Sequence, residues 1–397
     1  MSFLTLPTGN MEQQNVKMKD LTPFSKVFVT KCTDYDVNNI YSNLKKSIGC
    51  FDDLSSFIKK GEKVLLKPNM IIGKKPEFHV NTHPAIVESI AKVVLECGGI
   101  PEIGDSPQRG TATELSRIIG YDKIASKLNI KIVDFTEPRI SFYKDSKIYK
   151  KFEIDKKIFG YDKIINLAKL KTHASAIVSL SIKNIFGVIS GPYKIEKHLN
   201  CRDNTELFAT MLLELYNIVK PSFNIVDGIY GMEGDGPTDG VPRKLNMLIC
   251  GNDGIAVDRV ICELLGIDHN IVPIFKANKK LKIGEDNIKN IEILNENIDD
   301  LKVSDFKLPT TVSKESALPI KLLKRIVKSV LNDYFLTRPV ISQQLCKKCF
   351  KCIKVCPFNA ISNKNNLVKI DKKKCMRCYC CHETCEYGAI KIKKGLI

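Results

Sequence analysis

Short apolar runs alternate with helical patterns along most of the chain. Helical periodicity covers 84–96, 113–119, 206–219 and 254–265. Pro84 starts the first of these helices, and Gly98 follows its end. Apolar runs of strand length stand at 64–67, 101–104, 130–135, 163–167, 223–226, 245–250 and 291–294. This alternation predicts a layered α/β domain with a mostly parallel sheet.

Changes in pattern divide the chain into four parts. Residues 1–25 are polar and show no sustained period, which predicts an N-terminal tail. The α/β domain then spans 26–316, with 140–154 as an inserted hairpin. An amphipathic stretch between Pro319 and Pro339 predicts a helical connector over 317–340. Residues 341–397 form a separate small domain.

Composition narrows the class of protein. The 397 residues are 44% hydrophobic, as in ordinary globular proteins. No unbroken apolar run reaches the length of a membrane helix, and the first residues lack the apolar core of a signal peptide. We therefore expect a cytoplasmic protein with no membrane partner.

Eight of the fifteen cysteines form two runs with identical spacing, C-x2-C-x2-C-x3-C. The second run repeats the first 29 residues later, and Ala360-Ile361 recurs as Ala389-Ile390, so the segment is an internal duplication. Zinc sites use two separated C-x2-C pairs, and disulfides do not suit a reducing cytosol. The spacing instead fits three thiolates wrapped around an iron-sulfur cubane, with the fourth arriving from elsewhere. The runs are Cys346, Cys349, Cys352 and Cys356, then Cys375, Cys378, Cys381 and Cys385.

This segment resembles the bacterial two-cluster ferredoxins. The resemblance implies a small α+β ferredoxin-like domain with two 4Fe-4S clusters, in which the fourth cysteine of each run serves the other cluster. Two positions depart from the pattern. Glu386 replaces the proline that usually follows the last ligand, and Cys380 is a ninth cysteine without an assigned role. The implied ligand sets are Cys346, Cys349, Cys352 and Cys385 for cluster 1, and Cys375, Cys378, Cys381 and Cys356 for cluster 2.

The net charge of +18 does not require a nucleic-acid partner. From residue 341 onward there are thirteen Lys and Arg against three Asp and Glu, so more than half of the surplus surrounds the expected clusters. A cluster with four thiolates is an anion, and a basic shell around it is expected. The basic residues 372–374 and Arg377 also suit an acidic redox partner protein.

Polar residues gather where the predicted strands end, and in an open parallel sheet ligands bind beyond the carboxyl ends of the strands. Taken singly, each is more often a helix cap or a solvated loop residue than a site residue. Together they predict a pocket for an anionic substrate, with lysines and histidines as cationic and proton-transferring groups and two aspartates as orienters. No Walker loop or dinucleotide fingerprint is present. The candidate catalytic residues are Lys67, Asn69, Asp105, Lys171, His173, Lys183, His198 and Asp227.

Four segments of the large domain resemble the iron-sulfur family known as domain of unknown function 362. They read V-L-L-K-P-N at 64–69, G-D-S-P at 104–107, N-L-A-K-L-K-T-H at 166–173 and I-K-N-I-F-G at 182–187. The resemblance implies an α/β domain joined to a ferredoxin module, with no settled reaction.

The spacing of His173, Lys183 and His198 is similar to that in the nickel-pincer lactate racemases, where a lysine tethers the cofactor and histidines ligate nickel or move protons. Residues 105–120 also look similar to a neighbouring racemase loop. The proton-transferring histidine of that loop has no counterpart, since Asp105 and Ser106 stand near its place. An additional metal or organic cofactor in the α/β domain is therefore an open question.

Three functions fit these observations. The first is a ferredoxin-coupled oxidoreductase that passes single electrons to a substrate or cofactor in the α/β domain, because fusion keeps donor and acceptor at high effective concentration. The second is a redox-neutral epimerase or racemase with structural clusters. The third is a non-enzymatic electron carrier. We favour the first, with the substrate open.

Overall fold

The computed structural model describes residues 25–108, 110–142, 151–201, 204–312, 337–356 and 358–394. Most of the predicted tail and most of the predicted connector lie outside these residues. None of the helices within the described ranges has both the length and the apolar character needed to span a membrane.

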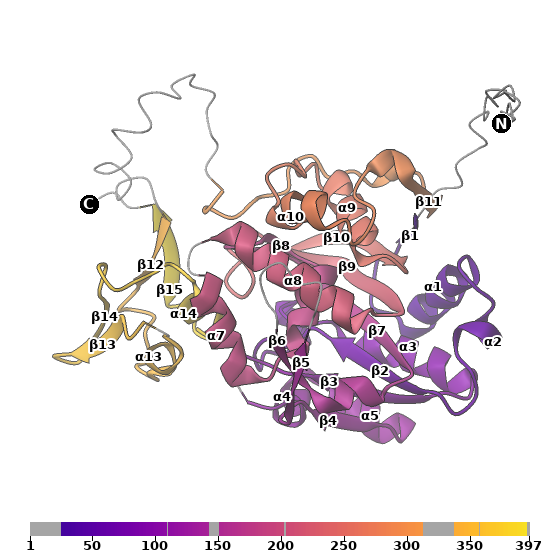
Figure 1. Ribbon diagram of the computed structural model, residues 1–397, viewed down its shortest axis with the longest axis horizontal. Helices are drawn as coiled ribbons and strands as arrows, with labels where there is room; N and C mark the ends of the chain where they lie inside the picture. The colour runs from indigo at the N-terminus through magenta and orange to yellow at the C-terminus, as the bar shows by residue number, and fades with distance from the viewer. Residues whose placement is uncertain are drawn as a thin grey trace, which may run out of the picture.

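A nine-stranded sheet forms the centre of the large domain (Figure 1). Its strands are β1 (Ser25–Lys31), β2 (Lys63–Pro68), β3 (Ile100–Asp105), β4 (Lys131–Asp134), β7 (Lys163–His173), β8 (Ile177–Ser179), β9 (Phe223–Glu233), β10 (Val241–Gly251) and β11 (Ile291–Asn295). The order is β11-β1-β10-β9-β7-β2-β3-β4, and β8 pairs with β7. The pairs β1·β11, β9·β7, β7·β2, β2·β3 and β3·β4 are parallel, whereas β10 is antiparallel to both neighbours. The predicted mostly parallel α/β class is confirmed.

Helices cover both faces of this sheet. Successive strand residues point to opposite faces, so Val64 and Leu66 pack into one core while Leu65 packs into the other. Both faces of the central strands are buried, which explains their continuous apolar runs. The core that contains Val64 and Leu66 is covered by α1 (Val37–Gly49), α3 (Pro84–Glu96), α4 (Ala112–Ile119) and α5 (Tyr121–Leu128), and α2 (Leu54–Phe57) lies at its edge. The core that contains Leu65 is covered by α8 (Thr205–Val219), α9 (Gly254–Leu264) and α10 (Pro273–Leu281).

Two strands are much longer than the sequence pattern predicts. Strand β7 continues beyond Leu167 to His173, and β9 continues beyond Val226 to Glu233. The predicted hairpin is present as the antiparallel pair β5 (Pro138–Phe142) and β6 (Lys151–Asp155). The residues between these two strands lie outside the described part.

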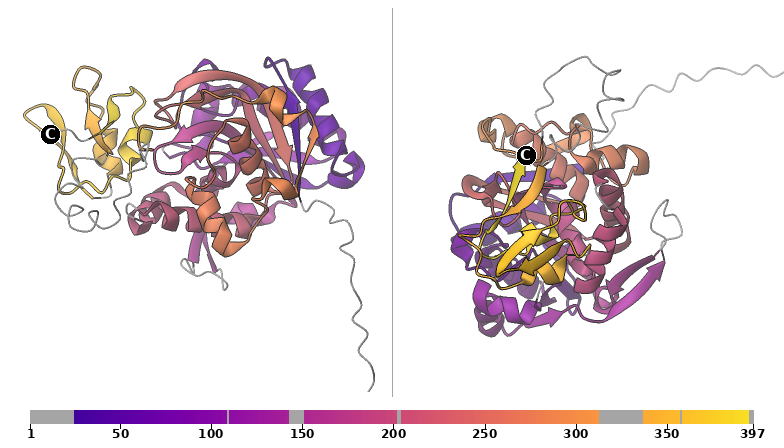
Figure 2. Two further views of the ribbon diagram at one scale, coloured as in Figure 1. Left: turned by 90° about the horizontal axis from the view of Figure 1, so that it is seen from above. Right: turned by 90° about the vertical axis from the view of Figure 1, so that its left-hand side faces the viewer.

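The C-terminal residues form a small α+β module, as predicted. Strand β12 (Thr337–Ile341) pairs antiparallel with β15 (Ile390–Lys394), and β13 (Ile361–Lys364) with β14 (Leu367–Ile370). Two short helices, α13 (Lys351–Val355) and α14 (Cys380–Glu383), lie between the strands. The module packs against one side of the large domain, with α14 turned toward it (Figures 1 and 2).

Candidate functional site

A buried ion pair joins the carboxyl ends of β2 and β3. Lys67 Nζ lies 2.9 Å from Asp105 Oδ1, and both side chains are almost fully excluded from solvent. Asp105 also accepts hydrogen bonds from the backbone N–H groups of Met70 (2.8 Å) and Ser106 (3.0 Å). Burial lowers the pKa of Lys67, and the Asp105 carboxylate opposes this shift. The pair therefore links the ends of β2 and β3, and the Asp105 carboxylate compensates the charge of Lys67.

A chain of hydrogen-bonded amides, of which all but Asn69 are buried, holds α6 (Ser181–Asn184) in place. Asn69 Nδ2 donates to Asn184 Oδ1 (3.0 Å), and Asn184 Nδ2 donates to Asn166 Oδ1 (2.8 Å). Asn166 in turn donates to Asn224 Oδ1 (2.9 Å). Because every amide in the chain finds a partner, the network fixes α6 against the strand ends with little freedom.

Lys171 holds the side chain of Asn69 in place through a hydrogen bond. Its Nζ donates to Asn69 Oδ1 (2.6 Å) and to the Val80 carbonyl (2.7 Å), and the side chain is fully buried. Burial lowers the pKa of Lys171 well below its usual value. Lys171 is absent from the pocket lining described below, so its place in the structure is that of a positioning residue.

Helix α6 carries Lys183 into the pocket. Asp258 of α9 caps this helix, because its carboxylate accepts hydrogen bonds from the N–H groups of Ser181 (2.8 Å) and Ile182 (3.1 Å). Burial raises the pKa of Asp258 to about 7. The Lys183 ammonium lies 5.0 Å from the centre of the Phe186 ring, and burial lowers its pKa. Sequence reasoning missed Asp258, whose partners are more than seventy residues away.

A second lysine enters the pocket from α7 (Gly191–Cys201). The Lys194 ammonium donates a hydrogen bond to the backbone carbonyl of Ser106, at the end of β3. Burial lowers the pKa of Lys194 to about 7. Lys194 belongs to none of the motifs quoted above, and sequence reasoning missed it.

His173, at the end of β7, points toward the C-terminal module. Its Nδ1 accepts hydrogen bonds from the N–H groups of Ser175 (3.1 Å) and Ala176 (3.2 Å), so in the neutral ring the proton lies on Nε2. His173 Nε2 is 3.0 Å from Glu383 Oε1 of α14. Burial lowers the pKa of His173, and Glu383 opposes this shift.

Further contacts fasten the module over the sheet edge. Lys391 Nζ lies 2.6 Å from Asp239 Oδ2, and His382 Nε2 lies 3.2 Å from the Asp235 carbonyl oxygen. Ala174 packs against Tyr379 and Ile392 in a small apolar cluster. The two domains therefore share one interface, and the candidate pocket lies within it.

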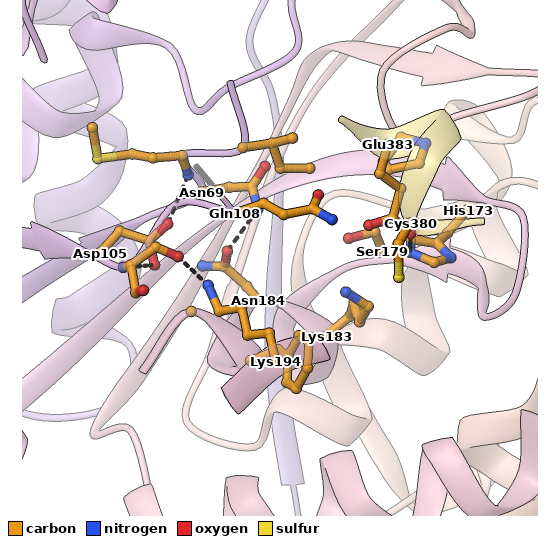
Figure 3. A pocket seen from close by; sticks show the side chains of 16 residues that line it. Asn69, Asp105, Gln108, His173, Ser179, Lys183, Asn184, Lys194, Cys380 and Glu383 are labelled. Atoms are coloured by element: carbon orange, nitrogen blue, oxygen red, sulfur yellow. Dashed lines mark hydrogen bonds and ion pairs between the residues drawn. The ribbon is translucent and has the colours of Figure 1, made fainter. Parts of the chain in front are cut away.

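The pocket has walls from both domains (Figure 3). Lys183 and Lys194 point into it from one side, while Cys380 stands close to Ser179 and His173 at the other end. Cys380 sits in the chain between Cys378 and Cys381, so the wall of the pocket is part of the second cysteine run. The lining consists of Asn69, Met70, Ile71, Asp105, Ser106, Gln108, His173, Ser179, Lys183, Asn184, Phe186, Gly187, Lys194, Pro237, Cys380 and Glu383.

The structure does not place Asp227 in this pocket. Asp227 Oδ2 lies 2.8 Å from Lys169 Nζ, both side chains are fully buried, and Asp227 Oδ1 accepts a hydrogen bond from Tyr35 (3.0 Å). His198 belongs to α7, but its side chain lies outside the described residues. Of the eight candidate catalytic residues, the pocket lining brings together Asn69, Asp105, His173 and Lys183, with Lys67 and Lys171 directly behind.

The eight cysteines of the two runs line two separate cavities. One cavity contains Cys346, Cys349, Cys352 and Cys385, and the other contains Cys356, Cys375, Cys378 and Cys381. Each cavity thus takes three sulfurs from one run and one from the other. This grouping is the one that the ferredoxin resemblance implies.

The chemistry of these donors fits an iron-sulfur cluster. Burial, and then the neighbouring sulfurs of Cys385, Cys346 and Cys349, raise the pKa of Cys352 to about 11. Burial and the sulfurs of Cys378, Cys375 and Cys356 raise the pKa of Cys381. Four soft sulfurs crowded around an apolar cavity become thiolates only when a cationic core offsets their repulsion, which iron provides.

The loops around both cavities repeat the same backbone conformations. Lys348 and Phe350 have φ values of 51° and 57°, and Arg377 and Tyr379, 29 positions later, have 55° and 60°. The N–H groups of Ala360 and Ala389 donate to the sulfurs of Cys356 (3.3 Å) and Cys385 (3.2 Å). The duplication seen in the sequence is therefore a duplication of structure, including the hydrogen bonds to the fourth cysteine.

Two family models match the chain. The family described as domain of unknown function (DUF362) matches residues 64–263, and a 4Fe-4S binding domain matches residues 338–361. The thylakoid-associated protein sll1697 of Synechocystis sp. (strain ATCC 27184 / PCC 6803 / Kazusa) is 30% identical over 311 residues, which are 78% of this chain and 94% of that protein.

A solved structure gives a more distant similarity. The lactate racemase apoprotein from Thermoanaerobacterium thermosaccharolyticum is 14% identical, with a TM-score of 0.40 over 62% of this chain. The matched part spans 58% of the racemase chain. A similarity at this level says nothing about shared chemistry. The family match over half of the chain, together with the 4Fe-4S domain, leads to one conclusion: this chain is an iron-sulfur protein that belongs to the DUF362 family.

Proposed function

We propose that this protein is an oxidoreductase that transfers single electrons to a small molecule held in the pocket between its two domains. The observation that carries the proposal is the position of Cys380, which lines the pocket and sits between Cys378 and Cys381 in the chain. A molecule bound there lies against the cysteine run that would hold a cluster. No long-range carrier is then needed between the cluster module and the bound molecule.

Two sets of four thiolates would hold the clusters. Bound 4Fe-4S clusters supply one electron at a time, at a potential tuned by hydrogen bonds to sulfur and by exposure. The first set is Cys346, Cys349, Cys352 and Cys385, and the second is Cys356, Cys375, Cys378 and Cys381.

The residues around the pocket supply binding, orientation and shielding from water. Lys183 and Lys194 present positive charge to the bound molecule from α6 and α7. The His173–Glu383 pair closes the end of the pocket next to Cys380. The ion pair between Asp239 and Lys391 holds the C-terminal module against the large domain, so the cysteine loop stays at a fixed distance from the pocket.

The experiment follows reoxidation of the reduced protein. Protein purified without oxygen is reduced, freed of excess reductant and mixed with a series of small oxo acids and unsaturated acids, while the broad cluster absorption is recorded. For at least one acceptor we expect reoxidation that saturates with acceptor concentration and that slows at least about tenfold in Lys183→Met, a loss of about 1.4 kcal/mol.

Lys280→Met is the control, because the Lys280 side chain on α10 is 71% exposed and its ion pair among the described residues is with Glu206 of α8. It should reoxidise at the wild-type rate. Reoxidation at one rate in all three proteins, with every acceptor, would contradict the proposal, because the pocket would then play no part in it.

A further inference from the structure

The described lysines whose ammonium groups are withdrawn from solvent differ in what lies beside the ammonium. Lys171 has no carboxylate there, but its Nζ donates to the oxygens of Asn69 and Val80. Lys67, Lys169 and Lys197 each have a carboxylate oxygen close to the ammonium, at 2.9, 2.8 and 2.6 Å. These three charges are compensated within the fold, as buried charges usually are.

Lys183, which is partly buried, and Lys194, which is buried, are different. Among the described residues, neither ammonium has a carboxylate within ion-pair distance; Lys194 donates to the Ser106 carbonyl, and Lys183 lies over the rings of Phe186 (5.0 Å) and Phe208 (5.7 Å). Both ammonium groups point into the pocket (Figure 3). Two cationic groups in one small cavity repel each other and lose hydration.

The carboxylates that line the pocket are already engaged. Asp105 holds the Lys67 ammonium and two backbone N–H groups, and Glu383 lies 3.0 Å from His173. Glu383 and Asp105 therefore act on the two ammonium groups only from beyond contact distance, and no described carboxylate pairs directly with either of them. An anion from outside the chain would complete the pocket.

We propose that this pocket binds a small carboxylate, with its oxygens received by the ammonium groups of Lys183 and Lys194. This deepens the proposed function, on which it rests for the identity of the site, by naming the class of molecule that takes the electrons. The remaining walls fit such a molecule, because Met70, Ile71 and Phe186 provide apolar contact while Gln108 and Ser179 offer hydrogen bonds.

The source of the positive charge favours a carboxylate over a polyphosphate. Polyphosphate sites use a row of backbone N–H groups at the start of a helix, whereas the positive charge here comes from two side chains.

The test measures binding to the oxidised protein with its clusters in place, so no electron transfer is involved. Malonate is titrated calorimetrically at constant ionic strength into the wild type, Lys183→Met, Lys194→Met and the exposed control Lys280→Met. Iron, sulfide and visible absorption are compared first, so that every variant has the same cluster content. We expect saturable binding of one malonate per chain, weakened at least about tenfold by each pocket substitution and unchanged in the control.

Arginine variants show whether a loss of binding comes from the lost charge or from misfolding of the methionine variants. Lys183→Arg and Lys194→Arg keep the charge, and we expect them to bind malonate more tightly than the methionine variants. Equal binding in all variants, or no saturable binding, would overturn the proposal. Saturable binding of inorganic phosphate without binding of malonate would overturn the carboxylate assignment. If malonate binds as expected but no acceptor reoxidises the protein, the binding site stands and the proposed function fails.

Discussion

His173 Nε2 of the sheet domain lies 3.0 Å from Glu383 Oε1 of the cysteine module, and both side chains are buried. This contact links the end of β7 to the helix that follows Tyr379, across more than two hundred residues of sequence. It also closes one end of the pocket, so docking of the module and formation of the site depend on the same pair.

Removing this pair should loosen the module. His173→Ala leaves the Glu383 carboxylate buried with one partner fewer, which costs about 1–3 kcal/mol. We expect a lower midpoint of thermal unfolding and faster cleavage between the domains by a protease. His269→Ala serves as the control, since His269 is partly exposed and its described contacts are with Asp268 and Phe275 of the large domain. If both variants resist the protease as the wild type does, the pair does not hold the module in place.

The Lys67–Asp105 pair should matter for stability more than a surface ion pair. Asp105→Asn leaves a buried ammonium without its carboxylate, and breaking a buried pair in this way costs about 3–5 kcal/mol. The double variant Lys67→Met/Asp105→Asn removes both charges and keeps a side-chain oxygen as acceptor for the backbone N–H groups, so we expect it to recover a large part of this loss. Urea unfolding measures the three free energies. Equal stability of Asp105→Asn and the wild type would show that Lys67 is not charged in the folded protein.

Cluster ligands should follow the crossed grouping of the cysteines. Cys385→Ala should remove the same iron signal as Cys346→Ala, because the two sulfurs line one cavity. Cys356→Ala should instead match Cys375→Ala. Iron analysis and EPR of the reduced proteins distinguish the two patterns. Cys380→Ala should keep the full iron content, and the crossed grouping is wrong if Cys385→Ala matches Cys375→Ala.

Carboxylate binding should weaken as the pH rises. The pKa of Lys194 is lowered to about 7 by burial, with Asp105 opposing the shift and the charges of Lys67 and Lys183 adding to it. A bound anion favours the ammonium form and raises this pKa, so affinity is highest below pH 7 and falls as Lys194 deprotonates above it. Calorimetric titrations with malonate at several pH values measure the change.

Lys194→Arg isolates the contribution of this one group, because a guanidinium stays charged throughout the range. The fall in affinity through pH 7 should disappear in that variant. An unchanged fall in Lys194→Arg would assign the titration to a different group in the pocket.

The sequence predicted the sheet class and the cysteine chemistry, but three of the candidate site residues, Lys67, Lys171 and Asp227, do not line the pocket. Asp227 was expected beyond the end of a strand, since a charged residue after an apolar run usually marks one. In the structure it lies within β9, directly opposite Lys169 of β7 in the register of the parallel pair. The two charges neutralise each other across the strands, so both strands continue through them. An ion pair between strands distant in sequence leaves no local pattern.

The sequence predicted lining residues from the large domain but none of those from the C-terminal module. Asn69, Asp105, His173 and Lys183 follow strands or belong to quoted motifs, and the carboxyl-edge rule brings them together. Cys380 and Glu383 come from the other domain, and their approach depends on how the module docks. Side-chain interfaces of this kind have no periodicity in sequence.

If the pocket adjoins a bound cluster, an EPR experiment detects it. Oxygen-free protein is reduced, and its spectrum is recorded with and without saturating malonate. We expect signals from two 4Fe-4S clusters, with malonate changing the signal that Cys375→Ala abolishes and leaving the other as it was. A colourless protein without iron, or a spectrum that malonate leaves untouched although it binds in the pocket, would contradict this expectation.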